Sequence, residues 1–276
     1  MQKLFGISSI SESVGEFSRS KEMDRWVKKI AVVTGASAGI GAAIAKDLAK
    51  TGMIVVGLAR RVEKVEKLKN DLPEDMRQNL HSANCDVMKE EEIIKTFAWI
   101  DEKFGGVDVL INNAGILIPS VRLIDEGNSA TILNTVNTNL IGLIFCTREA
   151  FKSMKKRSFA GHIVHISSLV GHIVPNMQAT FDDYNFNVYC ATKHAVKALT
   201  EGHRQELLKE KLGIKVSSVS PAVVQTDIMD CYSEEALKTI PHLKAEDISA
   251  AVLYALGTPP HVQIQDIVIK PVGSFI

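Results

Sequence analysis

The stretch "TGASAGIG", residues 34–41, follows the short apolar run "IAVVT" (30–34) and leads into the helical pattern "AAIAKDLAK" (42–50). A strand, a glycine turn and a helix in this order are the signature of a dinucleotide site. Gly35 permits a tight turn, Gly39 lets the backbone approach a pyrophosphate, and Gly41 allows close helix packing. The spacing G-x-x-x-G-x-G differs from the G-x-G-x-x-G fingerprint, so the prediction depends on the position after the first strand.

The same turn offers donors to an anion. A helix N-terminus presents unpaired N–H groups to a phosphate, and the hydroxyl of Ser37 adds another donor. Ile40 lies in the same turn. We therefore predict that this segment binds cofactor phosphates through Gly35, Ser37, Gly39, Ile40 and Gly41.

Six further β-rich runs alternate with helical patterns along the chain. They cover residues 53–59, 80–85, 107–113, 161–167, 214–220 and 264–270. Such alternation predicts repeated βαβ units and a parallel sheet. Because the runs are continuously apolar, helices must cover both faces of the sheet. We predict an α/β fold with a single Rossmann-like, doubly wound sheet of about seven parallel strands, flanked by helices and contained in one domain over residues 23–276.

Composition excludes several classes of partner. With 32 basic and 32 acidic residues the formal net charge is zero, so no global field attracts nucleic acid or an anionic membrane. No apolar run approaches the ~18 residues of a membrane-spanning helix, which predicts no membrane span. A small molecule is the expected partner.

The cysteines and histidines indicate no metal site. The four cysteines, Cys85, Cys146, Cys190 and Cys231, include no C-x-x-C pair. His162 and His165 are three apart on a predicted strand and so lie on opposite faces. We expect reduced thiols in a cytoplasmic protein.

Two segments are expected to be mobile. Residues 1–22 are serine-rich and lack the apolar block of a secretory signal, so they are predicted to be a flexible arm. A mitochondrial presequence is the alternative, because basic residues lie among the serines, but three glutamates disfavour it. Residues 226–245 follow a strand end and mix apolar with turn residues, which is typical of a substrate lid.

The end of the second strand discriminates between cofactors. An NAD site places a carboxylate there, but this chain reads "GLARR" (57–61). Arg60 and Arg61 can pair with a 2′-phosphate, so we predict NADP(H) as the cofactor. The alternative is that both arginines are solvated charges at the start of the next helix; Arg60 is the stronger candidate.

Two later strand ends carry further candidates. In "CDV" (85–87), Asp86 is placed to accept from the adenine amino group, with Val87 packing nearby; an ordinary turn aspartate is the alternative. In "NNAG" (112–115), small residues leave room beside a flat ring, although an ordinary turn fits as well. Asn113, Ala114 and Gly115 are the candidates there.

The stretch "YCATK" (189–193) places a phenol and an ammonium on one helix face, at Tyr189 and Lys193. A free phenol has a pKa of ~10, but an adjacent cation stabilises its ionised form and makes an acid/base group near neutral pH. Such pairs also occur by chance on amphipathic helices. Upstream, "ISSLVG" (166–171) puts Ser167 and Ser168 at the carboxyl edge of the sheet. Asn139 lies in a helical stretch and needs a polar partner, such as a water held for Lys193.

The segments "TGASAGIG", "NNAG", "NLIG", "ISSLVG", "YCATK" and "SPAVVQTD" occur in the order and approximate spacing of the short-chain dehydrogenase/reductase family, which the chain resembles over residues 23–276. The resemblance implies a seven-stranded Rossmann sheet and a catalytic tetrad. In this tetrad, Tyr189 exchanges a proton with the substrate oxygen while hydride passes to or from the nicotinamide. The tetrad consists of Asn139, Ser168, Tyr189 and Lys193.

The resemblance assigns further roles. Lys193 lowers the phenol pKa and binds the nicotinamide ribose, and Ser168 orients the substrate oxygen. Asn113 lies by the cofactor ribose, while Val224 and Thr226 contact the nicotinamide amide. A homodimer or homotetramer is implied as well. The alternative from another class is a catalytically silent NADP-binding sensor or scaffold.

Four more segments, "MDRW" (23–26), "CTREA" (146–150), "TEGHRQEL" (200–207) and "VQIQDI" (262–267), resemble the farnesol dehydrogenase-like proteins of insects and the related vertebrate member 11-like dehydrogenase/reductases. This implies interconversion of an alcohol and its ketone or aldehyde. The substrate is expected to be apolar, either an isoprenoid alcohol such as farnesol or a ketosteroid.

The sequence departs from the family pattern at two places. Pro221-Ala222 replaces a proline–glycine pair, which predicts strain if the backbone needs a positive φ at Ala222. Residues 176–186 look like an insertion that reshapes the substrate mouth. Its aromatic residues Phe181, Tyr184 and Phe186 are candidates to line an apolar pocket.

Overall fold

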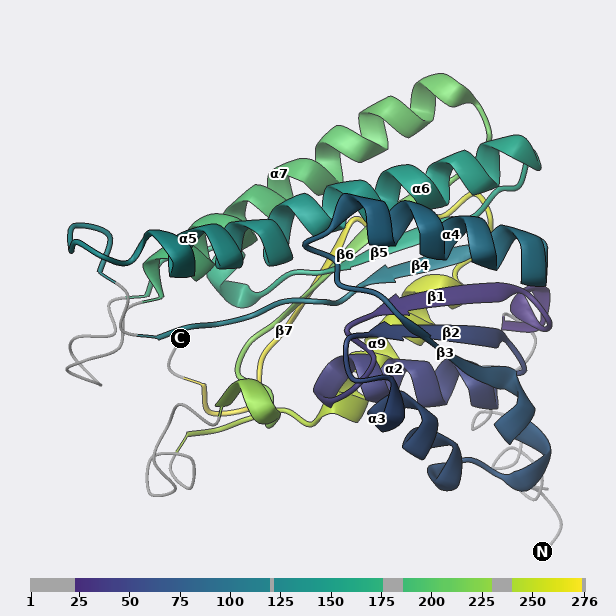
Figure 1. Ribbon diagram of the computed structural model, residues 1–276, viewed down its shortest axis with the longest axis horizontal. Coiled ribbons are helices and arrows are strands. Elements are labelled where there is room, and N and C mark those ends of the chain that lie inside the picture. The colour runs from purple at the N-terminus through teal and green to yellow at the C-terminus, as the bar shows by residue number, and fades with distance from the viewer. Residues whose placement is uncertain (1–22, 120–121, 176–185, 230–239, 275–276) are drawn as a thin grey trace, which may run out of the picture.

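The computed structural model describes residues 23–119, 122–175, 186–229 and 240–274. Within these residues, seven parallel strands form one sheet in the order β3-β2-β1-β4-β5-β6-β7 (Figure 1). The strand order reverses between β1 and β4, which is where doubly wound sheets bind ligands. The strands are β1 Ile30–Thr34, β2 Ile54–Ala59, β3 Leu80–Asn84, β4 Val109–Asn112, β5 His162–Ile166, β6 Lys215–Pro221 and β7 Asp266–Ile269.

Helices cover both faces of this sheet, as Figure 1 shows, with α4, α6 and α7 on one side and α2, α3 and α9 on the other. The α-helices are α2 Gly39–Lys50, α3 Val62–Lys67, α4 Glu90–Phe104, α5 Ser129–Val136, α6 Gly142–Lys156, α7 Asn187–Glu210 and α9 Ala245–Gly257. The shorter helical turns are η1 Asp24–Trp26, η2 Leu68–Asp71, η3 Glu74–Asn79, η4 Asn137–Ile141, η5 Leu169–Gly171 and η7 Asp227–Met229. The predicted arm, residues 1–22, lies outside the described residues.

The core is divided by the sheet because successive strand side chains point to opposite faces. In β1, Val33 packs in the cluster that includes α2 and α9, whereas Val32 packs in the cluster that includes α4 and α6. Both clusters are built from fully or almost fully buried apolar side chains. This explains why the predicted strands read as continuous apolar runs, and it confirms the doubly wound α/β prediction.

The observed strand bounds differ from the predicted ones mainly at the ends. β1 matches, five of the other six predicted runs contain a whole strand, and β6 extends one residue beyond its predicted end. The fourth strand ends at Asn112 because Asn113 turns away, its backbone N–H donating to Thr34 Oγ1 over 3.0 Å. The strain predicted at Ala222 is absent, since its φ is not positive. Instead its N–H donates to the Ile269 carbonyl over 2.8 Å, which prolongs the pairing of β6 with β7.

One helical segment bears on the predicted absence of a membrane span. Ser129–Lys156, which comprises α5, η4 and α6, is long and apolar enough to cross a membrane by length and composition alone. The fold buries 39% of its most apolar window, and α6 packs against α4 and β4. Core helices of globular proteins pass the same test, so the absence of a span stays a prediction.

Candidate active site

A cavity of about 590 Å³ lies at the carboxyl ends of the strands. It collects almost all of the residues predicted from the sequence, although they come from six different strand ends and from α7. Gly41 and Asn139 lie behind its wall. The predicted residues that line it are Gly35, Ser37, Gly39, Ile40, Arg60, Arg61, Asp86, Val87, Asn113, Ala114, Gly115, Ser168, Tyr189, Lys193, Val224 and Thr226.

The glycine turn leaves a cradle that side chains would fill. Gly35 and Gly39 have φ angles of +67° and +54°, a region that disfavours other residues. A Cβ at Gly35 would lie 2.9 Å from Ala114 Cα, and one at Gly39 would lie 3.0 Å from the Thr226 side chain. No side chain caps the N-terminus of α2, so its first-turn N–H groups face the cradle. These features fit the pyrophosphate of a dinucleotide.

Gly41 has a role that the sequence did not reveal. A Cβ there would lie 2.4 Å from both Asn113 Nδ2 and the Gly35 carbonyl oxygen. Asn113 Nδ2 donates to the carbonyls of Thr34, over 3.0 Å, and Gly35, over 3.2 Å. Gly41 therefore makes room for the amide that fixes the turn to the end of β4, which refines its predicted role in helix packing.

The two arginines after β2 both reach the cavity and are exposed. Arg61 Nη2 donates to Ser37 Oγ over 3.5 Å, which brings a cation and a hydroxyl together beside the glycine turn. The Arg60 carbonyl accepts from Asn84 Nδ2 over 3.2 Å, which ties this segment to β3. The structure thus places Arg61, the residue less favoured from the sequence, next to another predicted donor.

Asp86 is a turn residue that also lines the cavity. Its Oδ1 accepts from the Met88 N–H over 3.1 Å, which makes it a turn residue. It also lines the cavity, next to the buried Val87. One carboxylate can serve both purposes because its second oxygen is left for a ligand.

Ser168, Tyr189 and Lys193 meet at the other end of the cavity. Tyr189 and Lys193 lie in the first two turns of α7, and Lys193 Nζ is 5.5 Å from the centroid of the Tyr189 ring. Ser168 lies two residues after the end of β5 and hydrogen-bonds Tyr189. Lys193 is buried, and its Nζ donates to the Ile166 carbonyl over 2.8 Å. A phenol, a hydroxyl and an amine thus share one wall.

Burial controls the electrostatics of this group. It raises the pKa of Tyr189 to about 12, although the hydrogen bond with Ser168 acts in the opposite direction. It also lowers the pKa of Lys193 to about 8. The expectation that Lys193 brings the phenol pKa toward neutrality is wrong for this structure, because desolvation dominates and the amine faces the Ile166 carbonyl.

Asn139 lies in η4, a π-helical turn between α5 and α6. Single π-helical turns often occur at functional sites. Its buried amide accepts from the Ile116 N–H over 2.8 Å and donates to the Ile116 carbonyl over 2.9 Å. It also donates to Thr192 Oγ1 over 3.2 Å. Asn139 therefore ties the loop after β4 to α7, one residue before Lys193.

Comparisons with known proteins agree with this geometry. A family model described as short chain dehydrogenase matches residues 29–236. The chain belongs to the short-chain dehydrogenase family. It is 55% identical to the farnesol dehydrogenase of Aedes aegypti over 91% of the chain and 99% of that protein. It is 41% identical to the mouse dehydrogenase/reductase SDR family member 11, over 90% and 96% of the two chains.

Solved structures of similar fold include two complexes with NADP or a derivative of it. The closed form of a serine dehydrogenase complexed with NADP⁺ matches with a TM-score of 0.78 and 28% identity, over 90% of this chain and 96% of that one. An alcohol dehydrogenase from Thermococcus sibiricus complexed with 5-hydroxy-NADP matches with a TM-score of 0.73 and 26% identity, over 88% and 97%. This chain is accordingly an oxidoreductase of the short-chain dehydrogenase type.

The cavity of this short-chain dehydrogenase has apolar walls that sequence reasoning mostly missed. Phe186 was predicted to line it and does, whereas Phe181 and Tyr184 lie outside the described residues. From the predicted lid, Thr226, Ile228 and Ile240 line the cavity, while residues 230–239 lie outside the described residues. Positions just after strand ends are the signal that finds such residues, which also include Ile116, Leu117, Leu169, Val170 and Val223.

The structure describes three of the four cysteines of the dehydrogenase. Cys85, Cys146 and Cys190 are free and buried. Among the described residues, no group of three or more histidine, cysteine or acidic side chains is placed to hold a metal ion.

Proposed function

We propose that this short-chain dehydrogenase is an NADP(H)-dependent oxidoreductase that interconverts an alcohol and its ketone or aldehyde. One observation carries the proposal. A single cavity joins the Arg61–Ser37 pair at one end to Ser168, Tyr189 and Lys193 at the other. The first group suits a phosphorylated ribose, and the second suits proton transfer to an oxygen.

The residues present fit the cofactor. The glycine cradle and the first turn of α2 would hold the pyrophosphate, and Arg60, Arg61 and Ser37 would hold the 2′-phosphate. Asp86 and Val87 would bind the adenine, and Asn113, Val224 and Thr226 would line the remainder of the site. A bound nicotinamide supplies or accepts the hydride. Two similar structures, which hold NADP⁺ and 5-hydroxy-NADP, support the choice.

The protein's own residues handle the proton. In the reducing direction, Tyr189 donates its phenolic proton to the substrate oxygen, while Ser168 holds that oxygen by a hydrogen bond. Lys193 supplies a nearby positive charge when the phenolate forms, and Asn139 keeps the wall at Ile116 joined to α7. Because the pKa of Tyr189 is about 12, its phenol is fully protonated at neutral pH and can donate its proton.

The proposed substrate is apolar. Besides the catalytic group, the cavity has apolar lining residues: Leu117, Val170, Phe186, Ile228 and Ile240. The identity to the Aedes aegypti farnesol dehydrogenase favours an isoprenoid alcohol such as farnesol. A ketosteroid is the competing substrate class, and a catalytically silent NADP-binding sensor or scaffold is the competing function.

Assembly, location and the mobile segments stay predictions. A homodimer or homotetramer is supported by exposed apolar side chains on the outer helices, such as Leu133 of α5 and Leu208 of α7. The cytoplasmic location and the roles of the arm (1–22) and lid (226–245) follow from the sequence alone.

Turnover and binding assays together test the proposal. Purified protein is incubated with NADPH or NADH and a panel that includes farnesal and steroid ketones, and with NADP⁺ or NAD⁺ and farnesol, while the reduced nicotinamide is followed by absorbance. We expect turnover with the phosphorylated cofactor on at least one apolar substrate. Tight NADPH binding without any turnover would instead support the silent sensor.

A further inference from the structure

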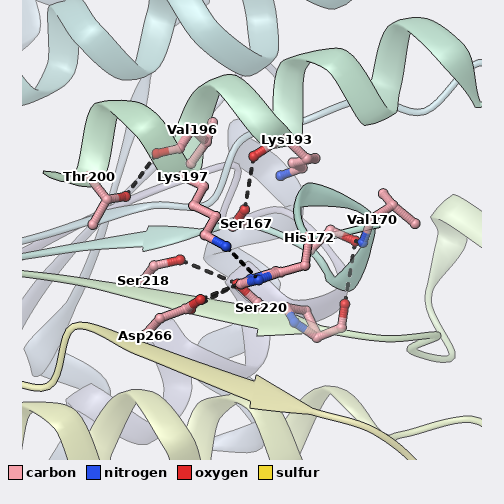
Figure 2. A network of polar contacts seen from close by, with 12 residues as sticks. Ser167, Val170, His172, Lys193, Val196, Lys197, Thr200, Ser218, Ser220 and Asp266 are labelled. Atoms are coloured by element: carbon pink, nitrogen blue, oxygen red, sulfur yellow. Dashed lines mark hydrogen bonds and ion pairs between the residues drawn. The ribbon is translucent and has the colours of Figure 1, made fainter. Parts of the chain in front are cut away.

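A polar network lies beside the turn that carries Ser168, and Figure 2 shows its members. The turn η5 has Ser168 as its N-cap and His172 as its C-cap. The His172 ring contacts three other elements: α7 through Lys197, β6 through Ser220 and β7 through Asp266. His172 does not line the cavity, so it cannot touch the substrate directly.

The partners of the His172 ring define its hydrogen-bonding state. Lys197 Nζ lies 2.9 Å from Nδ1, and a lysine ammonium can only donate. Nδ1 is therefore the acceptor, and Nε2 carries the proton that points to Asp266 Oδ2 over 2.9 Å. The ring is held between a cation and a carboxylate, which fixes its orientation.

The two ends of the turn are attached to consecutive residues of β6. The Ser168 hydroxyl donates to the Pro221 carbonyl over 3.4 Å, a long bond. His172 Nε2 lies 3.2 Å from Ser220 Oγ. Ser220 itself donates to Asp266 Oδ1 over 2.9 Å, so it stays in place without His172. Of these two attachments to β6, the one at the His172 end is the shorter, and Ser168 also hydrogen-bonds Tyr189.

We propose that His172, held between Lys197 and Asp266, is a positioning residue that fixes the Ser168 hydroxyl toward the substrate oxygen. The inference rests on the proposed function, which assigns Ser168 to that oxygen. Without the ring nitrogens, the turn keeps the long bond from Ser168 to Pro221, the hydrogen bond between Ser168 and Tyr189, and its packing against α7, where Gly171 lies under the Lys193 carbonyl. The turn then loses its hydrogen bonds to Lys197, Ser220 and Asp266, so Ser168 is held less firmly and turnover falls.

Three variants measure this effect. His172→Phe keeps a ring but removes both nitrogens, His172→Gln keeps one donor and one acceptor, and His261→Phe replaces an exposed histidine elsewhere. We expect His172→Phe to lower kcat by about 10–100-fold, the order of loss that a misplacement near 1 Å causes. NADPH affinity should be unchanged, since none of the three partners of the His172 ring is proposed to bind it. His172→Gln should recover part of kcat, and His261→Phe should match the unmodified protein.

A double-mutant cycle with Ser168→Ala separates positioning from a general loss of stability. If His172 acts through Ser168, then His172→Phe has no further effect on kcat once the hydroxyl is absent. Multiplicative losses in the double variant would overturn the proposal. Asp266→Asn, which removes the carboxylate that orients the ring, should lower kcat in the same direction and serves where His172→Phe folds poorly.

Hydrogen–deuterium exchange of the peptide covering residues 167–173 gives a readout that needs no turnover. The Val170 N–H donates to Ser168 Oγ over 3.3 Å and the Gly171 N–H to the Ser168 carbonyl over 2.9 Å. Both amides should exchange faster in His172→Phe, or in Asp266→Asn, and at the normal rate in His261→Phe. Unchanged exchange in the first two variants would overturn the positioning role. An inactive unmodified protein would overturn only the proposed function.

Discussion

Lys193 Nζ lies 5.5 Å from the centroid of the Tyr189 ring and donates its hydrogen bond to the Ile166 carbonyl. The two side chains lie four residues apart on one face of α7. The Lys193 amine is held by its bond to the Ile166 carbonyl and needs no contact with the phenol oxygen of Tyr189. Burial leaves the phenol with a pKa of about 12 and the amine with a pKa of about 8. Tyr189 is thus protonated at neutral pH and can act as a proton donor.

The direction of the reaction should respond to pH. Carbonyl reduction uses the neutral phenol, whereas alcohol oxidation uses the phenolate, whose fraction grows until pH passes the raised pKa. We predict that kcat for oxidation rises from about pH 7 to about pH 10 without a plateau, while kcat for reduction stays level up to about pH 8. An oxidation profile that is flat across this range would show that Tyr189 is not the base.

Replacing Lys193 by methionine should change how stability depends on pH. The folded protein lowers the pKa of this lysine from an ordinary value of about 10.5 to about 8, a cost of roughly 3 kcal/mol when the amine is charged. The unfolded chain binds more protons between these two values, so the unmodified protein gains stability as pH rises through them.

Lys193→Met removes this gain. The free energy of unfolding of the variant should exceed that of the unmodified protein by most below about pH 8. This difference should become smaller as the pH rises toward about 10.5. Part of the benefit is offset because the Ile166 carbonyl loses its donor, at about 1–3 kcal/mol. Urea denaturation at several pH values measures the difference. A difference that does not vary with pH would contradict the burial of a charged amine.

Arg61→Ala should weaken NADPH more than NADH. The Arg61–Ser37 pair is the cationic part of the proposed 2′-phosphate site, and a charge-assisted hydrogen bond contributes about 1.5–3 kcal/mol, or roughly 10–150-fold in affinity. Lys64→Ala, an exposed cation one turn further along α3, is the matched control. Binding titrations measure the affinity of each variant for NADPH and NADH. If Arg61→Ala loses affinity equally for both cofactors, the 2′-phosphate does not bind at Arg61.

Gly41→Ala should disrupt the glycine turn. Its Cβ would lie 2.4 Å from the Gly35 carbonyl oxygen, a backbone atom that cannot rotate away. We expect a loss of about 1–3 kcal/mol in unfolding free energy, together with weaker cofactor binding. Gly202→Ala in α7 meets no heavy atom within 4 Å and should keep or slightly raise stability. Thermal melting of the two variants, with and without NADPH, compares them; equal melting temperatures would refute the crowded turn.

Much of the fold follows from local sequence patterns. Alternating apolar runs and helices gave the seven strands, because strands buried on both faces must be apolar throughout. The glycine turn was predictable because its donors and its positive φ angles depend on residues close together in the chain. Ser168 and Tyr189 could be paired only through family resemblance, since 21 positions separate them and only the fold brings them together.

The remainder depends on tertiary contacts. The raised pKa of Tyr189 results from burial by several elements, which no spacing of charges in the sequence encodes. The amide of Asn139 binds Ile116 and Thr192, contacts that the sequence does not encode, while its predicted role in holding a water for Lys193 stays a prediction. The His172 network joins η5, α7, β6 and β7, so its members are scattered along the chain and carry no motif.

The most direct test of the central claim compares carbonyl reduction by the unmodified protein with that by Tyr189→Phe, using NADPH and the best substrate from the panel. The claim predicts that kcat falls by about 100-fold or more, since only the proton donor is lost, while NADPH affinity and thermal stability are retained. A Tyr189→Phe variant with undiminished turnover would contradict it.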